Sequence, residues 1–215
     1  MRCLSTVLSI ALLAFSQAAH ADVVVAQDDV NGFSLSYPDT WHRVSDQLPD
    51  DKLTIFAPEN GDNAYCRMKV REDSRYAIYP ARYSRAVQHT AVSKEFWDEY
   101  LSEFYFARPI SIRNDAGLGR GFASFAEVSF VGDNWPRMHR RGVMAASLYG
   151  NSLYIAECSS SAEAFSAWHE TFMGIIKSID FEKAIFEMPS GHYRDFLGDR
   201  TILISNEKAV DLYAY

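Results

Sequence analysis

Apolar and polar residues alternate in several short stretches of the chain, as they do in strands that bury one face. Residues 33–37 alternate three large apolar side chains with two serines, and residues 65–71 alternate cysteine, methionine and valine with arginine and lysine. A further strand is expected over 53–56, which ends at the turn-forming residues 58–62. The pattern therefore predicts half-buried strands, with Cys66 on the inward face of its strand.

Two segments repeat their apolar residues at helical spacing instead. In the segment 93–106, Ser93 is a candidate N-cap and Pro109 ends the pattern. The second segment begins with Ser160 and Glu163, which have the spacing of a capping box. We interpret both apolar stripes as the core-facing sides of helices that lie on a sheet. The stripes consist of Trp97, Tyr100, Leu101 and Phe104, and of Phe165, Trp168, Phe172, Ile175, Ile176 and Ile179.

The second half of the chain is expected to contain four further strands. They are residues 110–113, 121–131, 137–149 and 152–158. The glycine-rich segment 114–120 lacks the lysine of a phosphate-binding loop, so we interpret it as a flexible hairpin loop. Gly150 and Asn151 are a turn signal between the last two strands. Beyond residue 181, short strands are expected at 201–205 and 209–215.

The first 21 residues have the features of a secretory signal peptide. Arg2 gives a positive start, residues 4–15 are apolar, and Ala19-His20-Ala21 is a small-x-small cleavage site before Asp22. The apolar run is too short to span a bilayer as a mature helix, and no later segment is long and apolar enough to do so. We therefore expect a periplasmic or secreted protein that begins at Asp22.

Export changes the interpretation of the three cysteines. Cys3 is removed with the signal peptide, which leaves Cys66 and Cys158. An even pair of cysteines in an oxidising compartment favours a disulfide. The alternative is two separate buried thiols that behave as small apolar residues.

Composition narrows the classes of partner. The chain has 215 residues, of which 48% are hydrophobic and 14% aromatic, so it is globular. Its net charge is −7, and removal of Arg2 makes the mature chain −8, because residues 1–21 contain no acid. Nucleic acid and anionic lipid surfaces both attract clustered positive charge, so neither is an expected partner.

No catalytic motif stands out. The Gly-x-Ser-x-Gly turn of common hydrolases is absent, and His169-Glu170 begins a zinc-protease helix in which Met173 replaces the second histidine. The mature chain has five widely separated histidines, which are His42, His89, His139, His169 and His192. We therefore predict no metal site and no cofactor. A pair of carboxylates that meets only in space, as in glycosidases, stays open.

One basic cluster contrasts with the acidic chain. On a strand, Arg137, His139 and Arg141 would share one face, and Arg140 would point to the other. The functional interpretation is a binding face for a small anion or an acidic partner, because arginine forks suit carboxylate and phosphate. The favoured alternative is a solvated strand face whose cations pair with carboxylates on the next strand, such as Glu127.

The order of these elements and two sequence motifs resemble the PsbP-like family. This family includes the extrinsic PsbP subunit of photosystem II and bacterial DcrB-type envelope proteins. The C-terminal motif is Gly-Ile-Ile-Lys-Ser-Ile-Asp-Phe at 174–181, and the resemblance covers residues 28–181. The N-terminal motif consists of Gly32, Phe33, Tyr37, Pro38 and Trp41.

The resemblance implies an α+β fold, with a single antiparallel sheet and helices packed on its faces in an α/β/α sandwich. It divides the chain into a signal peptide (1–21), a PsbP-like domain (22–181) and a C-terminal extension (182–215). It also implies a non-enzymatic binding or accessory protein of the cell envelope, and supplies no catalytic residues. The alternative function is an exported hydrolase whose catalytic groups meet only in three dimensions. A released toxin or effector would carry the same signal peptide.

Overall fold

The computed structural model describes residues 22–44, 49–59, 61–75, 83–132 and 137–183. The expected signal peptide, and the short strands expected at 201–205 and 209–215, lie outside these residues. The described helices are α2 (Ser84–Ala91), α3 (Lys94–Ser102) and α4 (Phe165–Lys177). The described strands are β1 (Val23–Asp28), β2 (Phe33–Pro38), β3 (His42–Val44), β4 (Asp51–Phe56), β5 (Tyr65–Glu72), β6 (Tyr105–Leu118), β7 (Gly121–Val131), β8 (His139–Tyr149), β9 (Ser152–Ser161) and β10 (Asp180–Phe181).

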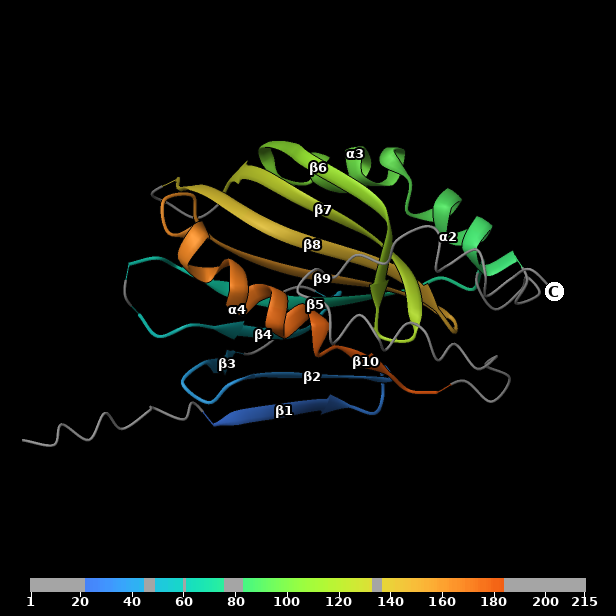
Figure 1. Ribbon diagram of the computed structural model, residues 1–215, viewed down its shortest axis with the longest axis horizontal. Coiled ribbons are helices and arrows are strands. Elements are labelled where there is room, and N and C mark those ends of the chain that lie inside the picture. Colours follow the sequence, from blue (N-terminus) through green and yellow to red (C-terminus); the bar gives the residue numbers. More distant parts are fainter. Residues whose placement is uncertain (1–21, 45–48, 60, 76–82, 133–136, 184–215) are drawn as a thin grey trace, which may run out of the picture.

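These strands form two antiparallel sheets (Figure 1). The larger sheet has seven strands in the order β3-β4-β5-β9-β8-β7-β6, and the smaller has the order β1-β2-β10. The expectation of a single sheet is therefore wrong. After α4 the chain continues as β10, which pairs Phe181 with Phe33 and Asp180 with Ser34. The alternation in β2 correctly indicated a buried face, but such a pattern does not identify the neighbouring strand.

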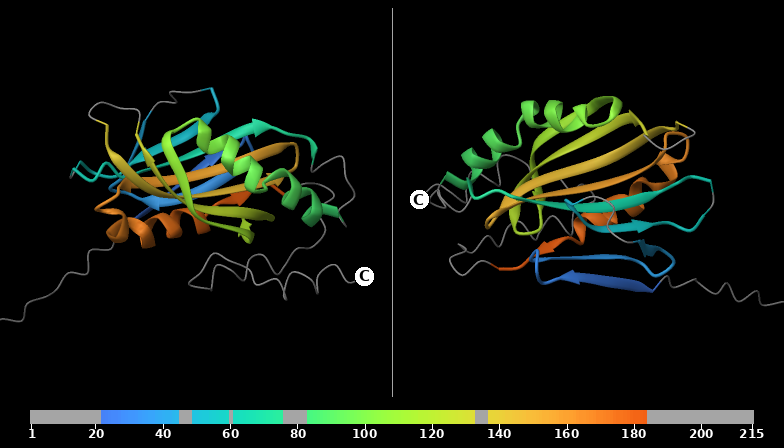
Figure 2. Two further views of the ribbon diagram at one scale, coloured as in Figure 1. Left: turned by 90° about the horizontal axis from the view of Figure 1, so that it is seen from above. Right: turned by 180° about the vertical axis from the view of Figure 1, so that it is seen from behind.

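Helices pack on both faces of the larger sheet. Figure 1 shows α4 in front of this sheet, and the view from behind in Figure 2 shows α2 and α3 on its other side. On the α4 side, Phe172 and Ile176 form one apolar core with β2, β4, β5 and β9. On the α3 side, Trp97 and Leu101 form a second core with β7, β8 and β9. The two helical stripes predicted from the sequence are thus the core-facing sides of α3 and α4, except that Phe104 and Ile179 lie beyond the ends of these helices.

The boundaries of several elements differ from the expectation. β6 continues to Leu118, so most of the glycine-rich segment is strand, and its hairpin turns at Gly119 with a φ of +56°. β9 continues to Ser161, and α4 begins at Phe165, so the capping box expected at Ser160 is wrong. The Ser161 hydroxyl instead accepts a hydrogen bond from the Ala164 amide at 3.4 Å. Helix α2 and strand β1 were not predicted.

The predicted disulfide is present. Cys66 on β5 lies directly opposite Cys158 on β9, and their sulfur atoms are bonded at 2.03 Å. The bond links two central strands on the α4 side of the larger sheet, where both cysteines are buried.

Candidate functional site

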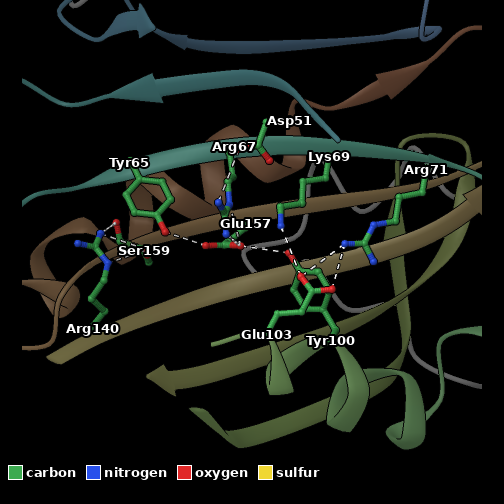
Figure 3. A network of polar contacts seen from close by, with 10 residues as sticks. All are labelled: Asp51, Tyr65, Arg67, Lys69, Arg71, Tyr100, Glu103, Arg140, Glu157 and Ser159. Carbon is green, nitrogen blue, oxygen red and sulfur yellow. Dashed lines mark hydrogen bonds and ion pairs between the residues drawn. The ribbon is translucent and has the colours of Figure 1, made fainter. Parts of the chain in front are cut away.

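A row of polar side chains lies on the face of the larger sheet that α3 covers. On β5, Cys66 and Met68 belong to the core on the α4 side. The alternate residues Tyr65, Arg67 and Lys69 face the other side, where Figure 3 shows them converging on Glu157 and the α3 helix. The charged face is not solvated, since only 3% of Lys69 is exposed. The sequence predicted the alternation but not the helix over the charged side.

Glu157 on β9 is the centre of this network. It is completely buried. Its Oε1 accepts a hydrogen bond from the Tyr65 hydroxyl at 2.8 Å. Its Oε2 accepts from Arg67 Nε at 3.0 Å and Nη2 at 2.9 Å, and from the Tyr100 hydroxyl at 3.2 Å. A buried carboxylate is stable only with such partners, and Glu157 has them on both oxygens.

The two phenols and the arginine stay in the forms that donate to Glu157. Burial raises the pKa of Tyr65 and of Tyr100, and the negative charge of Glu157 raises both further. Burial lowers the pKa of Arg67, but the charge of Glu157, its hydrogen bond and the two tyrosines together outweigh burial, and the net pKa is raised. Phenols that remain neutral and a guanidinium that remains charged together supply four donors to one anion.

Charged residues extend the network at both ends. At one end, Arg140 donates to the Ser159 hydroxyl and carbonyl at 3.1 Å, and its guanidinium lies 4.6 Å from the centre of the Tyr65 ring. At the other end, Lys69 Nζ lies 4.0 Å from Glu103 Oε2. Burial, and next the positive charge of Arg67, lower the pKa of Lys69.

The geometry of the network favours a structural role. A catalytic acid or base must reach a substrate, usually within hydrogen-bond distance. The Glu157 carboxylate has no exposed surface, and its acceptor positions are occupied by protein donors. The network therefore fixes α3 on β5 and β9. The sequence contained one signal for it, because Glu157 is the only charged residue in the apolar run 153–158.

The four residues of the predicted basic cluster occupy three environments. Arg141 donates from Nε to Glu127 Oε1 at 2.6 Å, and its guanidinium lies 4.8 Å from the Phe165 ring centre. Arg140 lies in the buried network on the opposite face. Arg137 and His139 are exposed. Carboxylate pairing, the favoured alternative, is thus present for Arg141, whereas an anion-binding role for Arg137 and His139 stays a prediction.

Aromatic side chains lie beside Arg137 and in the same row as His139, at the ends of β6, β7 and β8. The register places Tyr105 opposite Val131 and Val131 opposite His139, so the three share one face of the sheet. The Arg137 guanidinium lies 4.2 Å from the centre of the Tyr105 ring. The Phe106 ring packs edge-on against Tyr105, with 4.3 Å between ring centres.

Phe106 is the most unusual of these residues. Its side chain is 75% exposed, and its φ of +48° is in the left-handed region that bulky residues rarely adopt. Arg108 is exposed in the next row, opposite Ser129. Within the described residues, Arg108, Arg137 and His139 have no carboxylate partner. We call the following set the basic-aromatic surface: Tyr105, Phe106, Arg108, Arg137 and His139.

The sequence indicated only part of this surface. The apolar stripe of α3 suggested a helix through residue 106, but α3 ends at Ser102 and Tyr105 already belongs to β6. Helical spacing could not reveal that Phe106 sits where β6 breaks its register with β7, between Tyr105 and Arg108.

Comparison with solved structures finds similar folds at low sequence identity. No family model and no curated protein sequence matches the chain. The cyanobacterial PsbP of Synechocystis sp. PCC 6803 is 15% identical, with a TM-score of 0.49 over 79% of this chain and 98% of that one. The fold is similar to that of PsbP. The resemblance expected from the sequence is thus found in the structure as well.

Two further similar structures come from other organisms. LpqN, involved in cell envelope biogenesis of Mycobacterium tuberculosis, is 12% identical, with a TM-score of 0.45 over 76% of this chain and 92% of that chain. The Ran-binding protein Mog1p of Saccharomyces cerevisiae is 5% identical, with a TM-score of 0.45 over 75% and 96% of the two chains. At these identities the similarity concerns the fold alone.

The described part of the chain contains neither a membrane-spanning helix nor a cluster of metal ligands. Its three helices are each too short or too polar to cross a membrane. Its histidines, cysteines and acids form no group of three or more that could hold a metal ion.

Proposed function

We propose that this protein is an exported, non-enzymatic binding protein of the cell envelope, and that an acidic protein partner binds to its basic-aromatic surface. Phe106 is the observation that carries the proposal. A phenylalanine that is 75% exposed at a φ of +48° is unfavourable in both solvation and backbone conformation. Such strained residues cluster at binding and catalytic sites.

The chemistry of the neighbouring residues suits an acidic partner. Tyrosine and arginine are enriched where proteins bind one another, because rings supply area and guanidinium forks pair with carboxylates. The chain from Asp22 onward carries a net charge of −8. Arg108 and Arg137 therefore form a local positive region on an otherwise acidic protein.

The proposed location rests on the N-terminus and the cysteines. Residues 1–21 have the organisation of a cleaved signal peptide. A disulfide such as Cys66–Cys158 persists in oxidising compartments, which include the periplasm and the extracellular medium.

The alternative of a hydrolase has less support. Glu157, the most buried carboxylate, already accepts hydrogen bonds on both oxygens. His89 Nε2 lies 3.3 Å from Asp115 Oδ1, but both side chains are partly exposed at the surface.

The test is capture from an envelope extract by the immobilised protein. The double variant Arg108→Gln/Arg137→Gln removes both cations without touching a buried contact. We expect it to retain bound protein about tenfold less well, which corresponds to about 0.7 kcal/mol for each exposed charge. Arg43→Gln is the matched control, because Arg43 is exposed on β3 at the other edge of the larger sheet.

Salt provides a second readout. Exposed charges are screened over about 10 Å at 0.1 M salt, so added salt should weaken capture by the wild type more than capture by the double variant. Surface substitutions usually change stability by less than about 0.5 kcal/mol, so all variants should melt together. Equal capture by the wild type and the double variant would contradict the proposal.

A further inference from the structure

The described strands leave four sheet edges, and three of them are protected against pairing with another chain. β10 has two residues and β3 has three, too short to template a partner. β6 is long, but its register breaks in three places and it contains Pro109. Short length, bulges and proline are the usual devices that prevent edge-to-edge association.

The fourth edge, β1, has none of these devices. Its six residues pair with β2 in an unbroken register, from Val23 opposite Pro38 to Asp28 opposite Phe33. The strand reads Val-Val-Val-Ala-Gln-Asp, without lysine, arginine or proline. Its valines are exposed, Val23 at 64% and Val25 at 63%. Figure 1 shows β1 at the lower margin of the molecule, beyond β2.

We infer that the free edge of β1 pairs with β1 of a second copy of this chain, antiparallel about a two-fold axis at Val24. In this register Val24 lies opposite the partner's Val24, and Val23 lies opposite the partner's Val25. The two small sheets become one continuous sheet. The interface is isologous, so it closes after two copies and gives a dimer.

The sequence of the strand is complementary to itself in this register. The three central pairs are all valine with valine, and β-branched cross-strand pairs stabilise antiparallel strands. Asp22 lies opposite the partner's Ala26, and Asp28 lies beyond the paired residues, so no acid faces an acid. The two acids at the ends of the paired segment thus lie away from the three central valine pairs.

The size of the contact predicts a weak dimer. Stable interfaces bury about 1,200–2,000 Å² in total, more than one pair of short strands provides. We therefore expect association at high micromolar protein or above, which sedimentation velocity and light scattering detect. This inference is independent of the basic-aromatic surface, which lies on the other sheet.

The test compares the chain from Asp22 onward with two charged variants. Val23→Lys/Val25→Lys places lysine opposite lysine twice in the dimer, and Val23→Glu/Val25→Glu places glutamate opposite glutamate. Like charges directly opposite are destabilising, and we expect dimerisation to weaken at least tenfold in each variant. Val30→Lys is the control, because Val30 is 94% exposed and lies outside β1. This variant should dimerise as the wild type does.

Mixing the two charged variants gives the decisive result. The proposed register places each lysine opposite a glutamate, so an equimolar mixture should form the dimer that neither variant forms alone. Circular dichroism of each variant verifies that it is folded. A wild type that stays monomeric at millimolar concentration would overturn the inference. So would a dimer that persists in the lysine variant, or a mixture that associates no better than its components.

Discussion

Replacement of Glu157 by glutamine tests whether the buried network stabilises the fold. The substitution keeps the size of the side chain and removes its charge. The amide has one acceptor oxygen, whereas the carboxylate now accepts from Tyr65, Tyr100 and twice from Arg67. Even with that oxygen turned toward Arg67, the guanidinium would have neutral acceptors in place of its buried counter-charge, and the amide hydrogens would face the Tyr65 hydroxyl.

The contacts of Arg67 determine how much Glu157→Gln lowers the free energy of unfolding. Removal of one partner of a buried ion pair costs about 3–5 kcal/mol, because the other charge remains buried. Arg67 keeps some exposure, and Asp51 Oδ2 lies 3.8 Å from its Nη1. We therefore expect Glu157→Gln to lower the free energy of unfolding by about 3 kcal/mol, the lower end of that range.

The measurement is urea unfolding followed by tryptophan fluorescence, to which Trp97 contributes from a buried position on α3, one turn before Tyr100. Asp98→Asn is the matched control. The Asp98 side chain is 48% exposed on α3 and pairs with Lys94 outside the network, so its loss should cost less than about 1 kcal/mol.

A double variant isolates the pair. Arg67→Met/Glu157→Gln should be less destabilised than Glu157→Gln alone, because no unpaired guanidinium remains. If Glu157→Gln unfolds within about 0.5 kcal/mol of the wild type, or no more easily than Asp98→Asn, the reasoning is refuted.

Three further predictions concern the N-terminus, the disulfide and alkaline pH. Protein recovered from the periplasm or medium should begin at Asp22, and an intact Met1 in that fraction would contradict the predicted cleavage. Alkylation of denatured protein without reductant should add no label at Cys66 or Cys158. Conversion of both cysteines to alanine should lower the free energy of unfolding by up to about 4–5 kcal/mol, because the disulfide closes a 92-residue separation. Burial raises the pKa of Tyr65 and Tyr100 above the ordinary value of 10.0, so the folded state holds protons that the unfolded state releases above that pH. The stability that these phenols contribute should thus be fully present below about pH 10 and fall above it. The fall should be smaller in Tyr65→Phe. An equal fall in the wild type and this variant would contradict a raised pKa at Tyr65.

The pattern of apolar and polar residues predicted those features of the fold that depend on neighbouring residues. The alternation in β5 placed Cys66 inward, and its pairing with Cys158 followed from the count of cysteines in a chain that we expect to be exported. The stripes of α3 and α4 were correct because one buried face fixes the helical period. The second sheet was missed because neither partner of β2 was predicted: β1 has no alternating pattern, and the two residues of β10 are too short for one.

The network around Glu157 could not be predicted from the sequence, for a different reason. Tyr100 and Glu157 are 57 residues apart, and their contact depends on how α3 crosses the sheet. The spacing of residues in the sequence does not indicate how a helix crosses a sheet. A single acid within an apolar strand was nevertheless a signal, since a buried carboxylate requires donors from elsewhere.

The buried network and the basic-aromatic surface are joined by a short connection. α3 ends at Ser102 and β6 begins at Tyr105, so two residues separate the anchored helix from the exposed aromatic pair. One of them, Phe104, packs against Phe130 with 5.0 Å between ring centres. Trp97 also fixes the helix, through its hydrogen bond to the Ser124 hydroxyl at 2.7 Å. A helix held at several points leaves little freedom to the strand that follows it, and this rigidity keeps Phe106 in a backbone conformation that a free loop would relax.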